Sequence, residues 1–156
     1  MHTPGHTPGH IVVVADGAVI TGDHVLPEIS PFISTLLDPS PDPLGGFLGA
    51  LADDRLAADA LALPGHGGPF PRLGDRTAEL LSHHDARLAE IAGLLGSDAG
   101  TVWDVARDVT WFLPWRNLDA FSQRIALGET HAHLVRLERT GRADAVDGVP
   151  LRWTRR

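Results

Sequence analysis

Three short segments carry side chains that could hold a divalent metal ion. These segments are 2–10 (HTPGHTPGH), 21–24 (TGDH) and 63–67 (LPGHG). Each places one side chain, from His6, Asp23 or His66, beside glycine or proline where a strand is expected to give way to a loop. Neutral imidazole and carboxylate are suitable ligands for zinc, iron and manganese. The pattern therefore predicts a metal centre where three strand ends meet at one edge of a sheet.

The remaining histidines have other expected uses. The chain has nine histidines and no cysteine, so disulfides and thiolate ligands are excluded and any metal must be held by imidazole and carboxylate. His10 begins a strand and is expected to support the site through a hydrogen bond. His24 could face the site or the opposite side of its strand. His83 and His84 lie near core leucines of a predicted helix, which favours a packing role.

Two β-branched runs must position the first two segments. Residues 10–15 and 18–22 are separated by Asp16-Gly17, which predicts a tight hairpin whose two central residues both have positive φ. Both runs are apolar on both faces, as expected for strands inside a covered sheet. A third strand, 59–63, is expected to lead into the segment that carries His66.

Helices are predicted for most of the remaining chain. The apolar periodicity and the Gly, Pro and Asp boundaries give helices over 43–56, 75–95, 101–109 and 119–140, a connector over 111–117, and a final hairpin around Asp147-Gly148. From residue 98 onward, helices followed by a two-stranded wing form the outline of a winged helix.

Taken in order, the three metal-ligand segments resemble the later metal motifs of the metallo-β-lactamase-fold hydrolases, in the branch related to glyoxalase II that has a C-terminal winged helix. The resemblance covers essentially the whole chain. It implies a mixed fold class (α+β or α/β), in which residues 1–97 form the second half of a four-layer αββα sandwich and residues 98–156 form a small winged-helix domain.

The same resemblance implies a role for each ligand residue. His6 matches the third histidine of the first metal, His66 the histidine of the second, and Asp23 the carboxylate that bridges the two ions and serves catalysis. A complete site would hold two zinc ions, with iron or manganese as alternatives. A hydroxide held between the ions would attack a small-molecule ester, thioester or phosphodiester.

The family's His-x-His-x-Asp-His motif does not occur in this sequence. Each ion would keep one histidine and a share of Asp23, so we expect this chain alone to be a weak or inactive hydrolase. The alternative is a catalytically inactive, truncated half-domain, with Met1 as a late start, that acts as an interaction module or needs a complementing chain. Its strands would then expose an apolar edge and favour a homo-oligomer.

The composition restricts the kinds of partner that are expected. The net charge of −7 argues against nucleic acid as the main partner, although a winged-helix binder that uses Arg152, Arg155 and Arg156 is a third hypothesis. No run approaches the roughly 18 apolar residues of a membrane span, and no charged-then-apolar leader precedes the first motif. We therefore expect no membrane partner and a cytoplasmic location.

Overall fold

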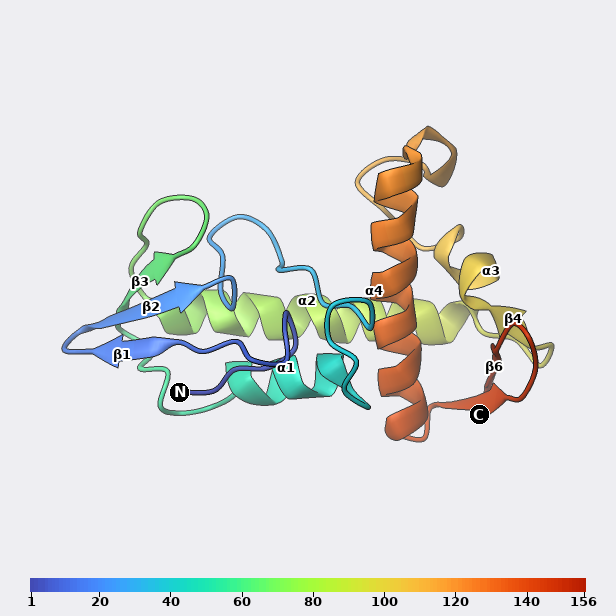
Figure 1. Ribbon diagram of the computed structural model, residues 1–156, viewed down its shortest axis with the longest axis horizontal. Coiled ribbons are helices and arrows are strands. Elements are labelled where there is room, and N and C mark those ends of the chain that lie inside the picture. Colours follow the sequence, from blue (N-terminus) through green and yellow to red (C-terminus); the bar gives the residue numbers. More distant parts are fainter.

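The computed structural model describes all residues, 1–156, and arranges two small sheets around a long helix (Figure 1). The elements in chain order are β1 (Val13–Ala15), β2 (Ala18–Gly22), α1 (Pro43–Leu51), β3 (Leu61–Pro64), α2 (Leu73–Leu94), β4 (Gly100–Thr101), α3 (Val102–Ala106), the 3-10 turn η1 (Trp115–Asn117), α4 (Ala120–Arg139), β5 (Ala143–Val146) and β6 (Arg152–Arg155). In Figure 1 the first sheet lies beside one end of α2, the second beside the other, and α4 crosses between them.

The first sheet has the strand order β1-β2-β3, with β1 antiparallel to β2 and β2 parallel to β3. The predicted hairpin is confirmed, since Ala15 pairs with Ala18 across Asp16-Gly17. Its turn differs from the prediction, because Gly17 has φ +72° whereas Asp16 is not in the positive-φ region. A turn with one left-handed residue requires glycine only at its second central position.

The prediction that both faces of these strands are covered is wrong. Val19 and Ala62 are buried on one face, which packs into the core with α1 and α2, whereas Ile20 on the other face is 49% exposed. Val13 and Val14 of the edge strand β1 are each 48% exposed. The apolar runs of β1 and β2 led to the prediction of layers on both faces of the sheet. The described chain covers only one of these faces.

The first two helices begin close to their predicted starts, but α1 is shorter than predicted. The Asp42 carboxylate accepts a hydrogen bond from the backbone N–H of Gly45, and Pro43 occupies the first turn, where a missing N–H costs nothing. The helix ends at Leu51 instead of residue 56, because Asp53 accepts the backbone N–H of Arg55 and turns the chain.

The second sheet has the strand order β4-β6-β5, all antiparallel. Thr101 and Asp104 form a reciprocal capping box that starts α3, which ends at Ala106, three residues short of the predicted end. The long helix α4 and the final hairpin lie close to the predicted positions. Trp153 of β6 is 1% exposed and packs against the rest of the core.

One hydrophobic cluster joins the two ends of the chain. It contains residues of both sheets and of all four α-helices, for example Val19, Phe47, Leu80, Val105, Leu134 and Trp153. No helix has the length and apolarity that a membrane crossing requires.

Candidate metal centre

The fold brings the three predicted ligand residues together. Asp23 follows β2 and His66 follows β3, and because these strands are parallel their carboxyl ends lie side by side. The backbone N–H of Gly65 donates to Gly22 O at 2.8 Å, which holds the two loops against each other. The Asp23 carboxylate then lies 3.6 Å from His6 Nε2 and 3.5 Å from His66 Nε2.

The two carboxylate oxygens of Asp23 face different histidines. Oδ2 is the oxygen nearest His6, and Oδ1 is the oxygen nearest His66. Oδ1 is buried and accepts no hydrogen bond from any protein group. A buried carboxylate oxygen without a donor is costly unless another ligand satisfies it, so Oδ1 is suited to a cation.

Each histidine–carboxylate distance suits a pair of ligands on one metal ion. Two ligands of a tetrahedral zinc ion at about 2.0–2.1 Å lie roughly 3.3 Å apart, close to both histidine–carboxylate separations. No three His, Cys, Asp or Glu side chains gather around a single position. The described residues therefore offer two pairs of candidate ligands, each made of one imidazole and one oxygen of Asp23.

His6 is held in the orientation that a ligand needs. Its Nδ1 lies 2.9 Å from the carbonyl oxygen of Phe32, which can only accept, so Nδ1 carries the proton and donates it. The lone pair then lies on Nε2, the nitrogen that faces Asp23. Metal-binding histidines commonly donate their second nitrogen to such an acceptor. His66 is far more exposed, at 75% of its side chain.

His10 holds the backbone of Asp23 in place. The backbone N–H of Asp23 donates to His10 Nε2 at 3.2 Å, so His10 Nδ1 carries the proton and donates to Thr3 Oγ1 at 2.8 Å. Burial and the neighbouring His6 lower the pKa of His10, which keeps the ring neutral. A Cβ on Gly22, whose φ is +52°, would lie 3.0 Å from His10 Nε2, so glycine permits this close approach.

His24 lies in the core rather than at the site. The sequence left both positions open, and the structure buries this side chain completely, edge-on to Phe47 at 5.2 Å between ring centroids. Neither ring nitrogen has a hydrogen-bond partner, and burial lowers the pKa of His24 to about 4.

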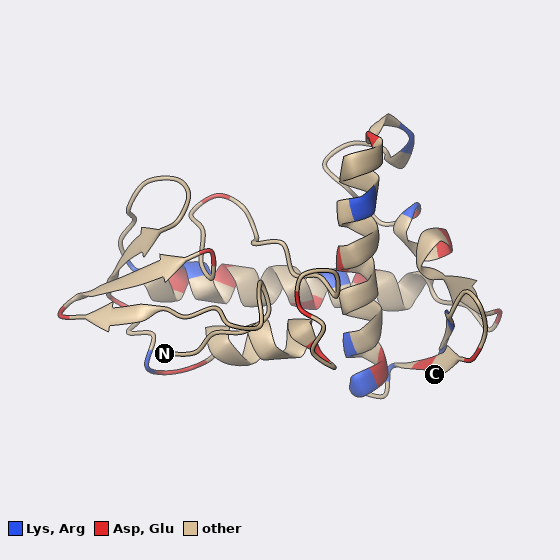
Figure 2. Cartoon of the chain, in the orientation of Figure 1, with Lys and Arg blue, Asp and Glu red and all other residues tan.

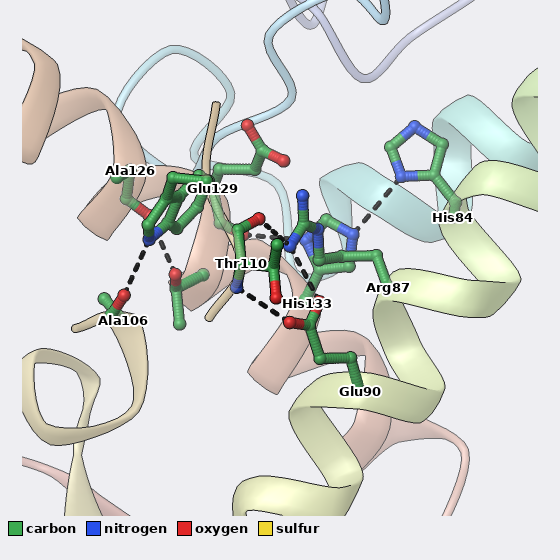
Figure 3. A network of polar contacts seen from close by, with 10 residues as sticks. His84, Arg87, Glu90, Ala106, Thr110, Ala126, Glu129 and His133 are labelled. Atoms are coloured by element: carbon green, nitrogen blue, oxygen red, sulfur yellow. Dashed lines mark hydrogen bonds and ion pairs between the residues drawn. The ribbon is translucent and has the colours of Figure 1, made fainter. Parts of the chain in front are cut away.

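A second polar cluster links α2 to α4, and its partners are not evident from the sequence (Figure 3). His133 Nδ1 lies 2.9 Å from the carbonyl oxygen of Glu129 and must donate to it, so its Nε2 accepts from His84 Nδ1 at 3.2 Å. His84 Nε2 in turn accepts from the Ser30 hydroxyl at 3.2 Å. Burial lowers the pKa of His84 to about 3 and that of His133 to about 4.

Arg87 extends this cluster to the connector between α3 and α4 (Figure 3). Its Nη1 donates to Thr110 O at 2.7 Å and pairs with Glu90 at 2.8 Å, while Glu90 accepts the N–H of Thr110. The guanidinium also lies over the Trp111 ring, 5.1 Å from its centroid. His84 thus packs between α2 and α4 and also takes part in this polar cluster, whereas the side chain of His83 is exposed.

Comparison with known proteins relates this fold to two solved structures. No family model and no curated protein matches the chain. A β-lactamase domain protein from Burkholderia ambifaria superposes with a TM-score of 0.83 and 34% identity, over 98% of this chain and 46% of that one. A metallo-β-lactamase family protein from Thermus thermophilus gives 0.81 and 34%, over 100% of this chain and 48% of that one. The chain spans about half the length of these relatives and shares their fold over that half.

Proposed function

We propose that this chain, which has the fold of metallo-β-lactamase family proteins over about half their length, is part of a metal-dependent hydrolase. It would bind zinc, or iron or manganese, through His6, Asp23 and His66, in a dinuclear site bridged by Asp23. The observation that carries the proposal is the Asp23 carboxylate, whose two oxygens face two different imidazole nitrogens at 3.6 and 3.5 Å.

The residues present would divide the work of such a site. Bound divalent metal would supply Lewis acidity and a hydroxide nucleophile for an ester, thioester or phosphodiester. Asp23 would be the ligand shared by both ions, and His10 would fix the Asp23 backbone. Phe32 O would keep His6 in the tautomer whose Nε2 lone pair points at the site.

Two protein ligands for each ion position make a weak site. Structural zinc sites have four protein ligands and catalytic ones three. We therefore infer that full activity requires further ligands from outside the described residues, in the same protein or a partner chain. Without them, this chain would bind metal in an open coordination and hydrolyse substrate slowly or not at all.

A zinc titration in chelator-treated buffer, followed by calorimetry, tests the proposal. Asp23→Asn removes the negative charge that both histidines face, and we expect zinc affinity to fall by about 100-fold. That is the upper end of the loss seen when residues that only support metal ligands are mutated. The matched control is Asp16→Asn, which removes one exposed carboxylate from the hairpin turn and should leave zinc affinity unchanged. Equal zinc affinity in wild type and Asp23→Asn, or no zinc binding by wild type, would contradict the ligand assignment.

We also infer that β4, α3, α4, β5 and β6 form a winged-helix-like unit beginning near residue 98, with a packing role instead of nucleic-acid binding. The three C-terminal arginines make contacts within the chain: Arg152 donates to Ala99 O, Arg155 to Ala92 O and Gly93 O, and Arg156 pairs with Asp144. Figure 2 shows short basic segments interspersed with acidic ones along the chain.

The exposed edge of the first sheet favours a second candidate function, an interaction module that pairs with another copy of the chain. β1 is an edge strand whose Val13 and Val14 are each 48% exposed, and such an edge readily accepts another strand. We expect light scattering to show dimers that Val14→Lys converts to monomers.

The control for this oligomer test uses the other sheet. Val146→Lys places the same charge on β5, the edge of the second sheet, where Val146 is 39% exposed. It should leave the dimer intact. A wild-type monomer, or equal effects of the two variants, would rule out association through β1.

A further inference from the structure

A cavity of about 530 Å³ lies between α4, the second sheet and the loop that carries Thr35 and Leu36. None of its lining residues belongs to the candidate metal centre. The volume lies in the range of small-molecule binding sites. Its walls are mainly apolar and include Leu36, Val102, Trp103, Leu127 and Leu151.

One face of α4 forms a long side of this cavity. Arg124, Leu127, Gly128 and His131 follow the spacing i, i+3, i+4 and i+7 and therefore share a face of the helix. A Cβ on Gly128 would meet Ser34 Oγ and lie 3.0 Å from Leu36 Cδ1. The absence of a side chain at Gly128 thus lets the loop lie directly against the helix and form the adjoining wall.

The charge of the cavity is positive, although the chain carries a net charge of −7. Arg124 is exposed, makes no ion pair or hydrogen bond, and is the only charged side chain in the lining; no carboxylate lines the cavity. An unpaired guanidinium beside apolar walls favours an anionic group attached to an apolar body.

Neutral polar groups complete the lining. Thr35 Oγ1 lies 2.7 Å from His131 Nδ1, and burial lowers the pKa of His131. The buried indole N–H of Trp153 has no acceptor. The lining thus contains polar groups but no second charge.

We propose that this cavity binds a small amphipathic carboxylate. The carboxylate pairs with the Arg124 guanidinium, and the apolar body packs against Leu127, Trp103 and Leu151. This site is independent of the proposed metal chemistry, because it uses none of the metal-centre residues.

The test uses decanoate, below its micellar concentration, and its neutral counterpart 1-decanol as probes, with binding to the full chain followed by calorimetry and tryptophan fluorescence. We expect wild type to bind decanoate at least tenfold more tightly than 1-decanol. Arg124→Gln should weaken decanoate binding at least tenfold and leave 1-decanol binding unchanged. Because Arg124 is exposed, the variant should remain folded, which circular dichroism verifies.

Arg139→Gln is the matched control, since Arg139 is an exposed arginine of the same helix that makes no ion pair and lies outside the cavity. It should leave both affinities unchanged. The proposal is overturned if wild type binds neither probe, if it binds both equally, or if Arg124→Gln binds decanoate like wild type.

Discussion

Replacing Gly5 with alanine is expected to lower the free energy of unfolding by about 3 kcal/mol or more, which corresponds to a fall in Tm of roughly 6–12 °C. Gly5 has φ +123°, a region that alanine adopts only under strain of about 1–3 kcal/mol. The new Cβ would also collide with Phe47 Cβ and lie 2.9 Å from Pro43 O, at the start of α1. Relieving that overlap costs about another 1–3 kcal/mol.

The sequence itself provides the control for this substitution. Gly9 occupies the equivalent place in the second His-Thr-Pro-Gly repeat, but its φ is not positive and no atom lies within 4 Å of a Cβ built there. Gly9→Ala should therefore change the free energy of unfolding by less than about 0.5 kcal/mol. Chemical denaturation of both variants measures the difference. If the two behave alike, the chain does not pack Gly5 against α1 as described.

The second large effect is a loss of stability in mild acid. His84 and His133 have folded-state pKa values of about 3 and 4, whereas an unfolded histidine titrates near 6.5. Both states are neutral above pH 6.5, so this contribution to stability is constant there. As the pH falls below 6.5, the two histidines bind protons in the unfolded chain but stay neutral in the folded chain. The free energy of unfolding then decreases by about 1.4 kcal/mol per pH unit for each histidine.

Between pH 7.5 and 5.5 the two histidines should together cost about 2–3 kcal/mol. Urea denaturation at several pH values measures the slope. His84→Asn removes one titrating group and should remove about half of this pair's contribution to the slope, whatever it does to the stability at neutral pH. His2→Gln, at an exposed position near the N-terminus, should retain the wild-type slope. An unchanged slope in His84→Asn would mean that His84 is not held neutral.

The local features could be predicted from the sequence because their signals are local. Asp16-Gly17 between two β-branched runs predicts the hairpin, and the glycines beside Asp23 and His66 predict that both candidate ligands lie at strand ends. Because β2 and β3 are parallel neighbours, their two ends meet. The prediction that His6 also lies at a strand end is wrong, because His6 occupies a bend before β1, between the bridged residues His2 and Ile11. Its approach to Asp23 and the tautomer-fixing contact with Phe32 O depend on tertiary packing that no spacing shows.

Other features depend on distant packing, which periodicity does not encode. The contact of His84 with His133 joins residues 49 positions apart, on two helices whose crossing is set by the whole core. The exposure of Val14 depends on which layers surround β1, and an apolar strand looks the same in sequence whether covered or open. The early end of α1 follows from one side-chain hydrogen bond of Asp53.

The long helix α2 runs from the first sheet to the second sheet and contacts both. At its start the backbone N–H of Leu73 donates to Ala60 O beside β3, and near its end Arg155 of β6 donates to Ala92 O and Gly93 O. With 22 residues it spans about 33 Å. Adding or removing one residue within α2 would rotate everything beyond it by about 100°. The length of this helix therefore sets the directions in which the candidate metal centre and the cavity face relative to each other.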